Sequence, residues 1–373
     1  MARTGINLLP PVITNAQAVE LYRNLAKTNL LIGQLKSEFD HSLVNNSLIS
    51  MFSLKESVQS TRIEGTQVTF SDMIERRKTD GDNWEQREVL NYQQALHTGA
   101  DMLKRGEPIS TRMIKGLHKI LMHNARGTNA AGGEFRKIQN FIGPDRKIEN
   151  AVYIPISAAE IDNYMENLEF FINDTTHSSF RKYNTADGYV LDEKCDPIIK
   201  LAIMHAQFES IHPFLDGNGR MGRILIALLA LKNGLVNAPV FLVSEELEKE
   251  RARYYDLLNG VRGDNPEWYP WLKFFIQACT RMTENLLAKI NAATKLANNG
   301  LEKCRLVSEQ RLWIYSFSDP ITTANKAAKA LGISPTTARA GLNKLATNEL
   351  LYADESVKHN RRYHNYDLLR ILS

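Results

Sequence analysis

The segment from His212 to Arg223 concentrates groups that could bind and activate a phosphate compound. It contains a titratable base, a carboxylate, a Gly-Asn-Gly turn and two arginines. Gly217 and Gly219 can adopt positive φ without steric cost, so several backbone N–H groups can point toward one anion. Arg220 and Arg223 are three apart, which places both guanidinium groups on one helical face, where they can hold phosphate oxygens. The segment therefore predicts a triphosphate site.

Apolar runs on both sides of this segment predict the elements that position it. Residues 198–211 and 224–231 are apolar and compatible with buried helices. Pro213 disfavours helical geometry at His212 and should end the first helix there. The second helix would direct its partly positive N-terminus at the same anion. His212 titrates near neutral pH and could accept a proton from an attacking hydroxyl, while Asp216 offers the oxygen ligand that Mg²⁺ prefers.

The pattern H-x-F-x-D-G-N-G-R-x-x-R in this segment resembles the signature of the Fic (filamentation induced by cAMP) family at all eight specified positions. The resemblance implies transfer of AMP from ATP, with Mg²⁺, to a Ser, Thr or Tyr hydroxyl of a target protein. It implies His212 as general base, Asp216 as metal ligand, Gly217, Asn218 and Gly219 as phosphate cradle, and Arg220 and Arg223 as ligands of the outer phosphates. Doc-like kinases carry lysine at the position of Gly219, so the glycine favours AMP transfer.

An upstream segment, Ser60-Thr61-Arg62-Ile63-Glu64-Gly65, resembles the inhibitory motif of the same family, [S/T]-x-x-x-E-[G/N]. Ser60 and Glu64 are four apart and share a helical face, and Gly65 is a suitable helix stop. The resemblance implies that Glu64 pairs with Arg223 and holds ATP in an unproductive pose. Without it, a serine and a glutamate on a helix are interpreted as ordinary surface residues.

Two further regions resemble parts of the family's ATP site. Residues 133–136 followed by 151–155 resemble its β-hairpin flap, which binds the target segment by strand addition, and residues 152–154 have strand character. The expected ATP contacts outside the motif are Val152, Tyr153, Ile154, Pro155, Tyr254 and Tyr255. A purely structural hairpin and a packed aromatic pair remain alternatives. Arg262 replaces an asparagine expected near the adenine.

The composition is that of an intracellular enzyme. The chain has 373 residues, 43% of them hydrophobic, which suffices for a sizeable core. Cys195, Cys279 and Cys304 follow no metal pattern and favour a reducing compartment. The N-terminus lacks the apolar core of a signal peptide and no run has membrane-spanning length, so we expect a cytoplasmic protein without a membrane partner, open to homo-oligomerisation.

The fold class expected is mostly α, with a Fic-type helical core, a small β-hairpin flap, an N-terminal helical region and a C-terminal winged helix. The domain limits expected are 1–104 for the region with the inhibitory helix, 105–298 for the catalytic core and 299–373 for the winged-helix-like domain. Within them we expect an amphipathic helix over residues 30–48 and a long helix from about residue 271 to 298, ended by Asn299-Gly300.

The C-terminal region carries the excess positive charge of the chain. Residues 301–373 contain 11 Lys and Arg against 7 Asp and Glu, a balance of +4 that equals the formal net charge of the whole protein. A helix over residues 321–331, a turn at Gly332 and a second helix opened by Ser334-Pro335 resemble a winged helix-turn-helix, with residues 350–352 and 362–363 as wing strands. The residues placed for DNA contact are Thr336, Thr337, Arg339, Lys344, Arg361 and Arg362. A protein-interaction or dimerisation module remains an equal alternative.

Three hypotheses about function follow. The first is an autoinhibited protein adenylyltransferase. The second is a de-AMPylating hydrolase at the same site, with Glu64 orienting a water molecule. The third is a winged-helix DNA-binding regulator whose Fic core only senses ATP.

Overall fold

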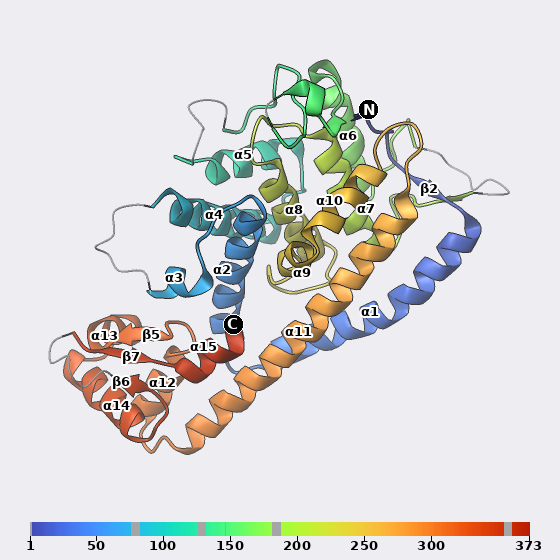
Figure 1. The fold of residues 1–373 in the computed structure, drawn as a ribbon. Coiled ribbons are helices and arrows are strands. Elements are labelled where there is room, and N and C mark those ends of the chain that lie inside the picture. The colour runs from blue at the N-terminus through green and yellow to red at the C-terminus, as the bar shows by residue number, and fades with distance from the viewer. Residues whose placement is uncertain (1, 76–82, 126–131, 146, 181–187, 354–359) are drawn as a thin grey trace. The chain divides into compact units, whose positions relative to one another are not determined.

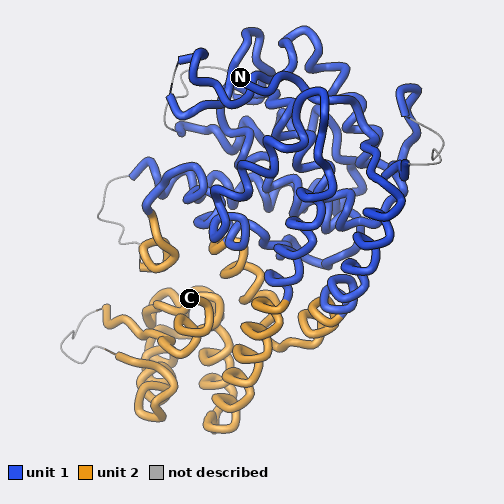
Figure 2. The backbone as a smooth tube through the Cα atoms, turned by 45° about the vertical axis from the view of Figure 1, so that its right-hand side comes forward, with its two compact units in different colours: residues 1–33, 56–67, 82–283 blue, residues 34–55, 68–81, 284–373 orange. Residues whose placement is uncertain are grey.

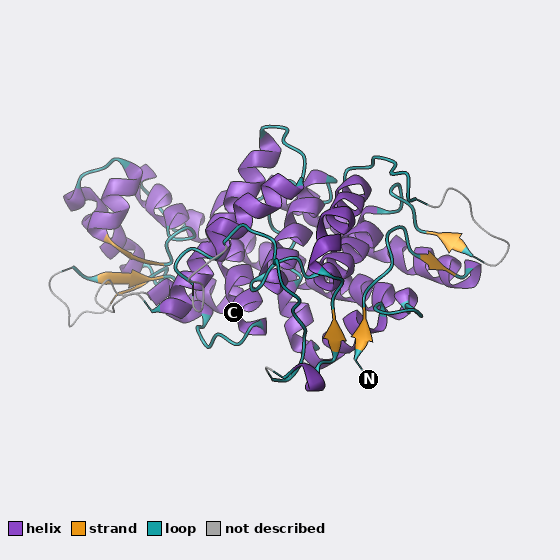
Figure 3. Cartoon of the chain, turned by 90° about the horizontal axis from the view of Figure 1, so that it is seen from above, coloured by secondary structure: helices purple, strands orange, loops and turns teal. Residues whose placement is uncertain are grey.

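The computed structural model describes residues 2–75, 83–125, 132–145, 147–180, 188–353 and 360–373, and helices predominate in it (Figures 1 and 3). The helices are α1 Asn15–His41, α2 Asn45–Ile63, α3 Phe70–Glu75, α4 Trp84–Lys104, α5 Thr111–Leu121, α6 Ile161–Ile172, α7 Pro197–Ile211, α8 Asn218–Lys232, α9 Ser244–Lys249, α10 Arg251–Gly260, α11 Trp268–Glu302, α12 Val307–Tyr315, α13 Ala324–Leu331, α14 Pro335–Thr347 and α15 Tyr366–Leu372. The strands are β1 Arg3–Thr4, β2 Val12–Ile13, β3 Tyr153–Ile154, β4 Tyr189–Val190, β5 Ile321–Thr323, β6 Tyr352–Ala353 and β7 Arg362–His364, with short 3₁₀ helices at Ile148–Asn150 and Ala158–Glu160. The expectation of a mostly α fold with small β elements is confirmed.

The chain divides into two compact units (Figure 2). The first contains residues 1–33, 56–67 and 82–283, and the second contains residues 34–55, 68–81 and 284–373. Helices α1, α2 and α11 each contribute residues to both units. The functional boundaries expected at residues 104 and 298 stay predictions.

Helices α7 and α8 lie in the core of the first unit (Figure 1). Every residue of α7 from 198 to 211 is buried, as expected for a helix that is apolar on nearly all sides. Helix α4 packs against α5 and α8, and α6 packs against α7. A Cβ added at Gly99 of α4 would come within 2.6 Å of Leu228 on α8, so this glycine permits the close approach of the two helices. The loop between α7 and α8 therefore starts and ends in well-packed elements.

The β elements of the first unit join segments that are distant in sequence. Strand β1 pairs with β3 in parallel, with Arg3 opposite Tyr153, and the two lie side by side near the N-terminus in Figure 3. Strand β2 pairs with β4 in antiparallel fashion. The hairpin expected from residues 133–136 and 151–155 takes a different form, because residues 133–136 are not a strand and Tyr153 has its antiparallel bridge with Ile142. Local sequence patterns carry no information on such distant pairing.

Two helical boundaries differ from those expected. The amphipathic run over residues 30–48 is interrupted, since α1 ends at His41 and α2 begins at Asn45. Within this turn Ser42 Oγ accepts the backbone N–H of Val44 at 3.4 Å. Helix α11 continues through Asn299-Gly300 to Glu302, because a Cβ at Gly300 would collide with the indole of Trp313 and the glycine serves packing there.

The C-terminal part of the second unit contains α12, α13, α14 and α15 with an antiparallel sheet of order β5-β7-β6. Residues 321–323, expected to be helical, form β5, and Thr323 then caps α13 through its side chain. Gly332 ends α13 at a φ of +64°, and Ser334 and Pro335 open α14 as expected. Strands β6 and β7 match the two expected wing strands to within a few residues.

Candidate functional site

His212 ends α7 in a left-handed backbone conformation, with a φ of 48°. Such a conformation is uncommon for a residue with a side chain and must be held by its surroundings. Arg136 holds it: its Nε donates to the carbonyl of His212 at 3.0 Å, and its backbone N–H donates to the carbonyl of Pro213 at 2.9 Å. The chain turns sharply here, and the imidazole is set at the start of the loop.

The imidazole of His212 has a defined tautomer. Its Nδ1 lies 3.3 Å from the carbonyl oxygen of Glu209, which can only accept, so Nδ1 carries the proton and Nε2 keeps its lone pair. Burial and the charge of Arg262 lower the pKa of His212 to about 4. Arg262 itself donates to the Glu209 carbonyl at 3.2 Å and to Ser210 Oγ at 3.1 Å. His212 is therefore neutral at pH 7 and able to accept a proton at Nε2.

Helix α8 begins with unsatisfied backbone donors. Gly217 is its N-cap, at a φ of 77°, and makes no side-chain cap hydrogen bond. The N–H groups of the first turn have no intrahelical acceptor, which makes this end of the helix suited to an anion. The Asn218 side chain is already used, since it accepts from the N–H of Phe214 at 2.9 Å and donates to its carbonyl at 2.8 Å. Asn218 thus closes the loop, and the backbone of α8 is left to bind the ligand.

Arg223 lies in the second turn of α8 and is 1% exposed. Its Nε donates to Ser60 Oγ at 2.8 Å, and its Nη2 donates to the carbonyl of Ser60 at 3.0 Å and to Glu64 Oε1 at 2.6 Å. Partial burial opposes ionisation of Glu64, but the charge of Arg223 outweighs this effect and keeps the pKa of Glu64 below its usual value. A Cβ at Gly219 would collide with the Glu64 carboxylate, so Glu64 also occupies the space above the first turn.

Arg220 takes a different partner. Its Nη1 lies 3.0 Å from Glu88 Oε2 of α4, and its Nη2 lies 3.5 Å from Asp216 Oδ1. Both Arg220 and Glu88 are buried. Nothing in the sequence around Glu88 indicates this role, because it resembles any charged residue near the start of a helix.

Asp216, the expected metal ligand, is exposed at the turn, and its Oδ1 accepts the N–H of Gly217 at 2.6 Å. No group of three or more His, Cys, Asp or Glu side chains is placed to hold a metal ion in the part of the chain that the structure describes. A single carboxylate with a free face suits Mg²⁺ only when phosphate oxygens complete its coordination. The donor set therefore fits a metal that arrives with a nucleotide.

His118 of α5 packs against the loop between α7 and α8. This role was not anticipated from the sequence. Its ring stacks on Phe214 with centroids 3.6 Å apart. Its Nδ1 accepts the N–H of Gly133 at 3.0 Å, and its Nε2 donates to the carbonyl of Asp216 at 2.9 Å. Burial lowers the pKa of His118 to about 4, so it is neutral and holds the loop through hydrogen bonds.

Comparison with known proteins shows which family parts of this chain resemble. Residues 108–230 match the Fic/DOC family, and residues 22–101 match the Fic/DOC family N-terminal region. The chain is similar to this family over these two segments. The protein adenylyltransferase Fic of Drosophila grimshawi is 26% identical over 233 residues, which cover 61% of this chain and 41% of that protein. The chain thus spans less than half the length of this relative.

Solved structures agree with the fold. A Fic family protein from Desulfovibrio desulfuricans G20 aligns over 96% of this chain and 98% of its own, with a TM-score of 0.56 and 19% identity. A Fic-1 fragment from C. elegans covers 74% of this chain and 76% of its own, with a TM-score of 0.50 and 20% identity. At these identities the likeness establishes the fold alone.

The remaining expected ATP contacts differ in their exposure. Tyr254 is buried, and its hydroxyl lies 2.8 Å from Nε2 of His205, so the expectation that one tyrosine of the pair belongs to the core is confirmed. Tyr255 is 41% exposed. Tyr153 is buried, donates to the carbonyl of Ser210 at 2.7 Å and lies beneath the guanidinium of Arg262. Of its neighbours, Val152 is exposed, Ile154 half-buried and Pro155 buried.

The cysteines and the helix lengths bear on the remaining expectations. The three cysteines are buried and form no disulfide. None of the described helices combines the length and apolar content needed to cross a bilayer.

Proposed function

We propose that this protein transfers AMP from ATP to a hydroxyl side chain of a target protein, and that Glu64 restrains the reaction. The observation that carries this proposal is the convergence of three features at one loop. These are the uncapped first turn of α8, the guanidinium groups of Arg220 and Arg223, and the neutral imidazole of His212. The relatives named protein adenylyltransferase Fic support the same class of reaction.

The chemistry assigned to these residues is an in-line displacement. The target hydroxyl attacks the α-phosphorus of ATP, its proton passes to Nε2 of His212, and pyrophosphate leaves as the bond to the α-phosphorus breaks. The backbone N–H groups of α8 and Arg223 stabilise the charge that develops on the phosphates. Asp216 would hold Mg²⁺ together with phosphate oxygens, and the metal would neutralise charge on the leaving group. The position of His212 is maintained by Arg136 and by the Glu209 carbonyl.

The restraint follows from competition for Arg223. A carboxylate at 2.6 Å occupies the guanidinium that the proposed reaction needs for the outer phosphate, and it stands over Gly219, where the phosphates would lie. Like charge repels a phosphate from this position. Displacement of Glu64 would therefore be required before ATP binds productively.

Hydrolytic removal of AMP from a modified protein is a second candidate at the same site. It is favoured by one observation, that the charge of Glu64 acts on His212 and raises its pKa against the effect of burial. In this reaction the Glu64 carboxylate would orient a water molecule for attack on the phosphorus, with the target hydroxyl leaving. In that case Glu64 would be required for the reaction and would not restrain it.

The test uses ATP labelled at the α-phosphate and measures label on protein. The variant Glu64→Gly is expected to increase labelling by about 5–150-fold, the range of a coupling free energy of about 1–3 kcal/mol. Adding His212→Ala should then reduce labelling by about 10²–10⁴-fold. Glu107→Gly is the matched control, because Glu107 also pairs with an arginine but does so at the surface, 2.9 Å from Arg105.

The two candidate reactions predict opposite effects of Glu64→Gly. Equal labelling of wild type and Glu64→Gly would contradict the restraint. Loss of AMP release from pre-labelled protein in Glu64→Gly, without a gain in labelling, would favour hydrolysis instead.

For the C-terminal part we also propose a winged helix-turn-helix. The order β5, α13, α14, β6, β7 supports it, as do the left-handed Gly332 between α13 and α14 and the antiparallel pairing of β6 with β7. Helix α14, with its N-terminal Ser334 cap, takes the position of the second helix of the motif.

A further inference from the structure

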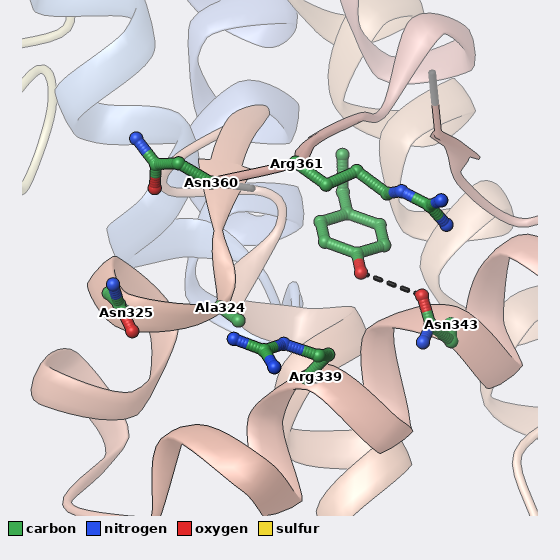
Figure 4. Close-up of a pocket in the computed structure, with 7 residues that line it drawn as sticks. Ala324, Asn325, Arg339, Asn343, Asn360 and Arg361 are labelled. Carbon is green, nitrogen blue, oxygen red and sulfur yellow. Dashed lines mark hydrogen bonds between the residues drawn. The ribbon is translucent and has the colours of Figure 1, made fainter. Parts of the chain in front are cut away.

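A small polar cavity lies between α13, α14 and the chain that enters β7 (Figure 4). Its volume is about 180 Å³. The residues that line it are Ala324, Asn325, Arg339, Asn343, Asn360, Arg361 and Tyr363. This cavity belongs entirely to the C-terminal part of the second unit and has no part in the site at α8.

The chemistry of the lining is that of an anion site. None of the seven lining residues is acidic, and two of them are arginines, Arg339 on α14 and Arg361 on the chain that enters β7 (Figure 4). Burial raises the pKa of Tyr363, and the charges of Arg361 and Arg339 both act against this rise, so both charges lie near the phenol. Guanidinium groups are suited to phosphate oxygens.

A hydrogen bond within the cavity orients an additional donor. The hydroxyl of Tyr363 donates to Asn343 Oδ1 at 2.7 Å. The oxygen of this amide is therefore already an acceptor, and its NH₂ group is left as the hydrogen-bonding end available to a ligand. Asn343, held by Tyr363, thus adds a directed donor to the lining of the cavity.

The size of the cavity selects among phosphate ligands. Sites for whole small molecules usually enclose about 300–1,000 Å³, so about 180 Å³ suits one phosphate group better than a complete nucleotide. The surrounding surface extends the positive charge. Helices α13 and α14 contain no acidic residue, and their exposed side chains include Lys329, Thr336, Thr337 and Lys344.

We propose that this cavity holds a backbone phosphate of double-stranded DNA, with the exposed start of α14 directed into the major groove. An α-helix fits this groove, and phosphate contacts on its flanks fix its position. Arg339 and Arg361 bind the phosphate, Asn343 donates to it, and Thr336 and Thr337 face the base edges. The inference is independent of the reaction proposed at α8.

The experiment measures fluorescence anisotropy of a labelled, random-sequence duplex of about two helical turns with the full-length protein, between about 50 and 200 mM salt. The double variant Arg339→Gln/Arg361→Gln should weaken binding at least tenfold and reduce the slope of log K against log salt by about 2, close to 0.9 for each lost charge. Arg370→Gln is the matched control, because Arg370 is exposed in the same unit and pairs with Asp367 at 3.4 Å outside the cavity. It should leave the slope within about 1 of wild type.

Several outcomes would overturn the proposal. One is absence of duplex binding by the wild type at the lowest salt. Another is an equal loss of binding in the double variant and in Arg370→Gln, which would indicate diffuse charge rather than a site. Binding of ATP or inorganic phosphate that depends on Arg339 while the duplex does not bind would assign the cavity to a small anion. The single variant Arg339→Gln, at an exposed position, gives the same discrimination if the double variant does not fold.

Discussion

Arg220 and Arg223 lie three residues apart in the first two turns of α8, and both are buried and paired with a carboxylate. The two carboxylates differ in exposure and in their place in a helix. Glu88, the partner of Arg220, has a side chain only 7% exposed and lies inside α4. Glu64, the partner of Arg223, is 34% exposed and follows the last residue of α2. One ion pair is built into the core, and the other stands at the end of a helix.

This difference in position indicates which of the two ion pairs can break. Gly65 follows Glu64 with a φ of +99°, so the chain turns away directly after the carboxylate. Movement of Glu64 requires rearrangement of a helix end, whereas movement of Glu88 requires disruption of the contact between α4 and α8. We infer that Arg220 is a fixed part of the site and that Arg223 is available for exchange between Glu64 and a phosphate.

The largest expected effect tests the fixed pair. Glu88→Gln should lower the free energy of unfolding by about 3 kcal/mol, because it leaves the buried guanidinium of Arg220 without its principal counter-charge. Glu64→Gln should cost less, about 1 kcal/mol, because water reaches this carboxylate and Arg223 keeps its two hydrogen bonds to Ser60. Urea unfolding of both variants at the same pH measures the difference. Equal costs would remove the distinction between the two pairs.

A third carboxyl group, that of Glu209, also interacts with the charge of Arg223. Glu209 of α7 is buried, and its Oε1 has no hydrogen-bond partner among the described residues. Burial raises its pKa to about 7, the charge of Arg223 acts against this rise, and the charge of Glu64 adds to it. If Glu64 leaves, the pKa of Glu209 falls and its carboxylate can form near Arg223. Glu209 can thus replace Glu64 as the counter-charge of Arg223.

The raised pKa of Glu209 predicts a pH dependence of stability. Below the unfolded-state pKa of about 4.5 both states bind the proton, and as the pH rises toward 7 only the folded state retains it. The stabilisation contributed by Glu209 is therefore complete at low pH and is lost as the pH passes 7. The free energy of unfolding of wild type relative to Glu209→Gln should decrease by about 3 kcal/mol between pH 4.5 and 8. A difference that does not vary with pH would contradict the assignment.

The sequence predicted the parts of the site that are local in the chain. The apolar runs located α7 and α8, Pro213 marked the end of α7, and the spacing of Ser60 and Glu64 placed both on one helical face, from which both contact Arg223. The identity of the partner came from the resemblance to the Fic family. No spacing rule relates residue 64 to residue 223.

The supporting residues that were missed are distant in sequence from the motif loop. Glu88, His118, Arg136 and Arg262 come from separate segments, and each meets the motif loop through tertiary packing. In sequence they are ordinary charged or polar residues of a helix or a loop. Two of them had a signal that pointed to another role. Arg136 belongs to residues 133–136, which were expected in the flap, although its side chain holds the His212 carbonyl. Arg262 departs from the residue expected near the adenine, although its side chain holds the Glu209 carbonyl. The pairing of β1 with β3 was missed for the same reason.

The smallest expected effect tests whether Ser60 belongs to the exchangeable pair. Ser60→Ala removes the hydroxyl that accepts from Arg223 Nε at 2.8 Å but keeps the carbonyl contact at 3.0 Å and the ion pair with Glu64. Loss of one hydrogen bond to a charged group, about 1.5 kcal/mol in net effect, should raise labelling from ATP by about tenfold. Ser60→Thr, which retains a hydroxyl, should label like wild type. In the Glu64→Gly background Ser60→Ala should add nothing, because Arg223 is already released, and a further increase there would mean that Ser60 acts through a different residue.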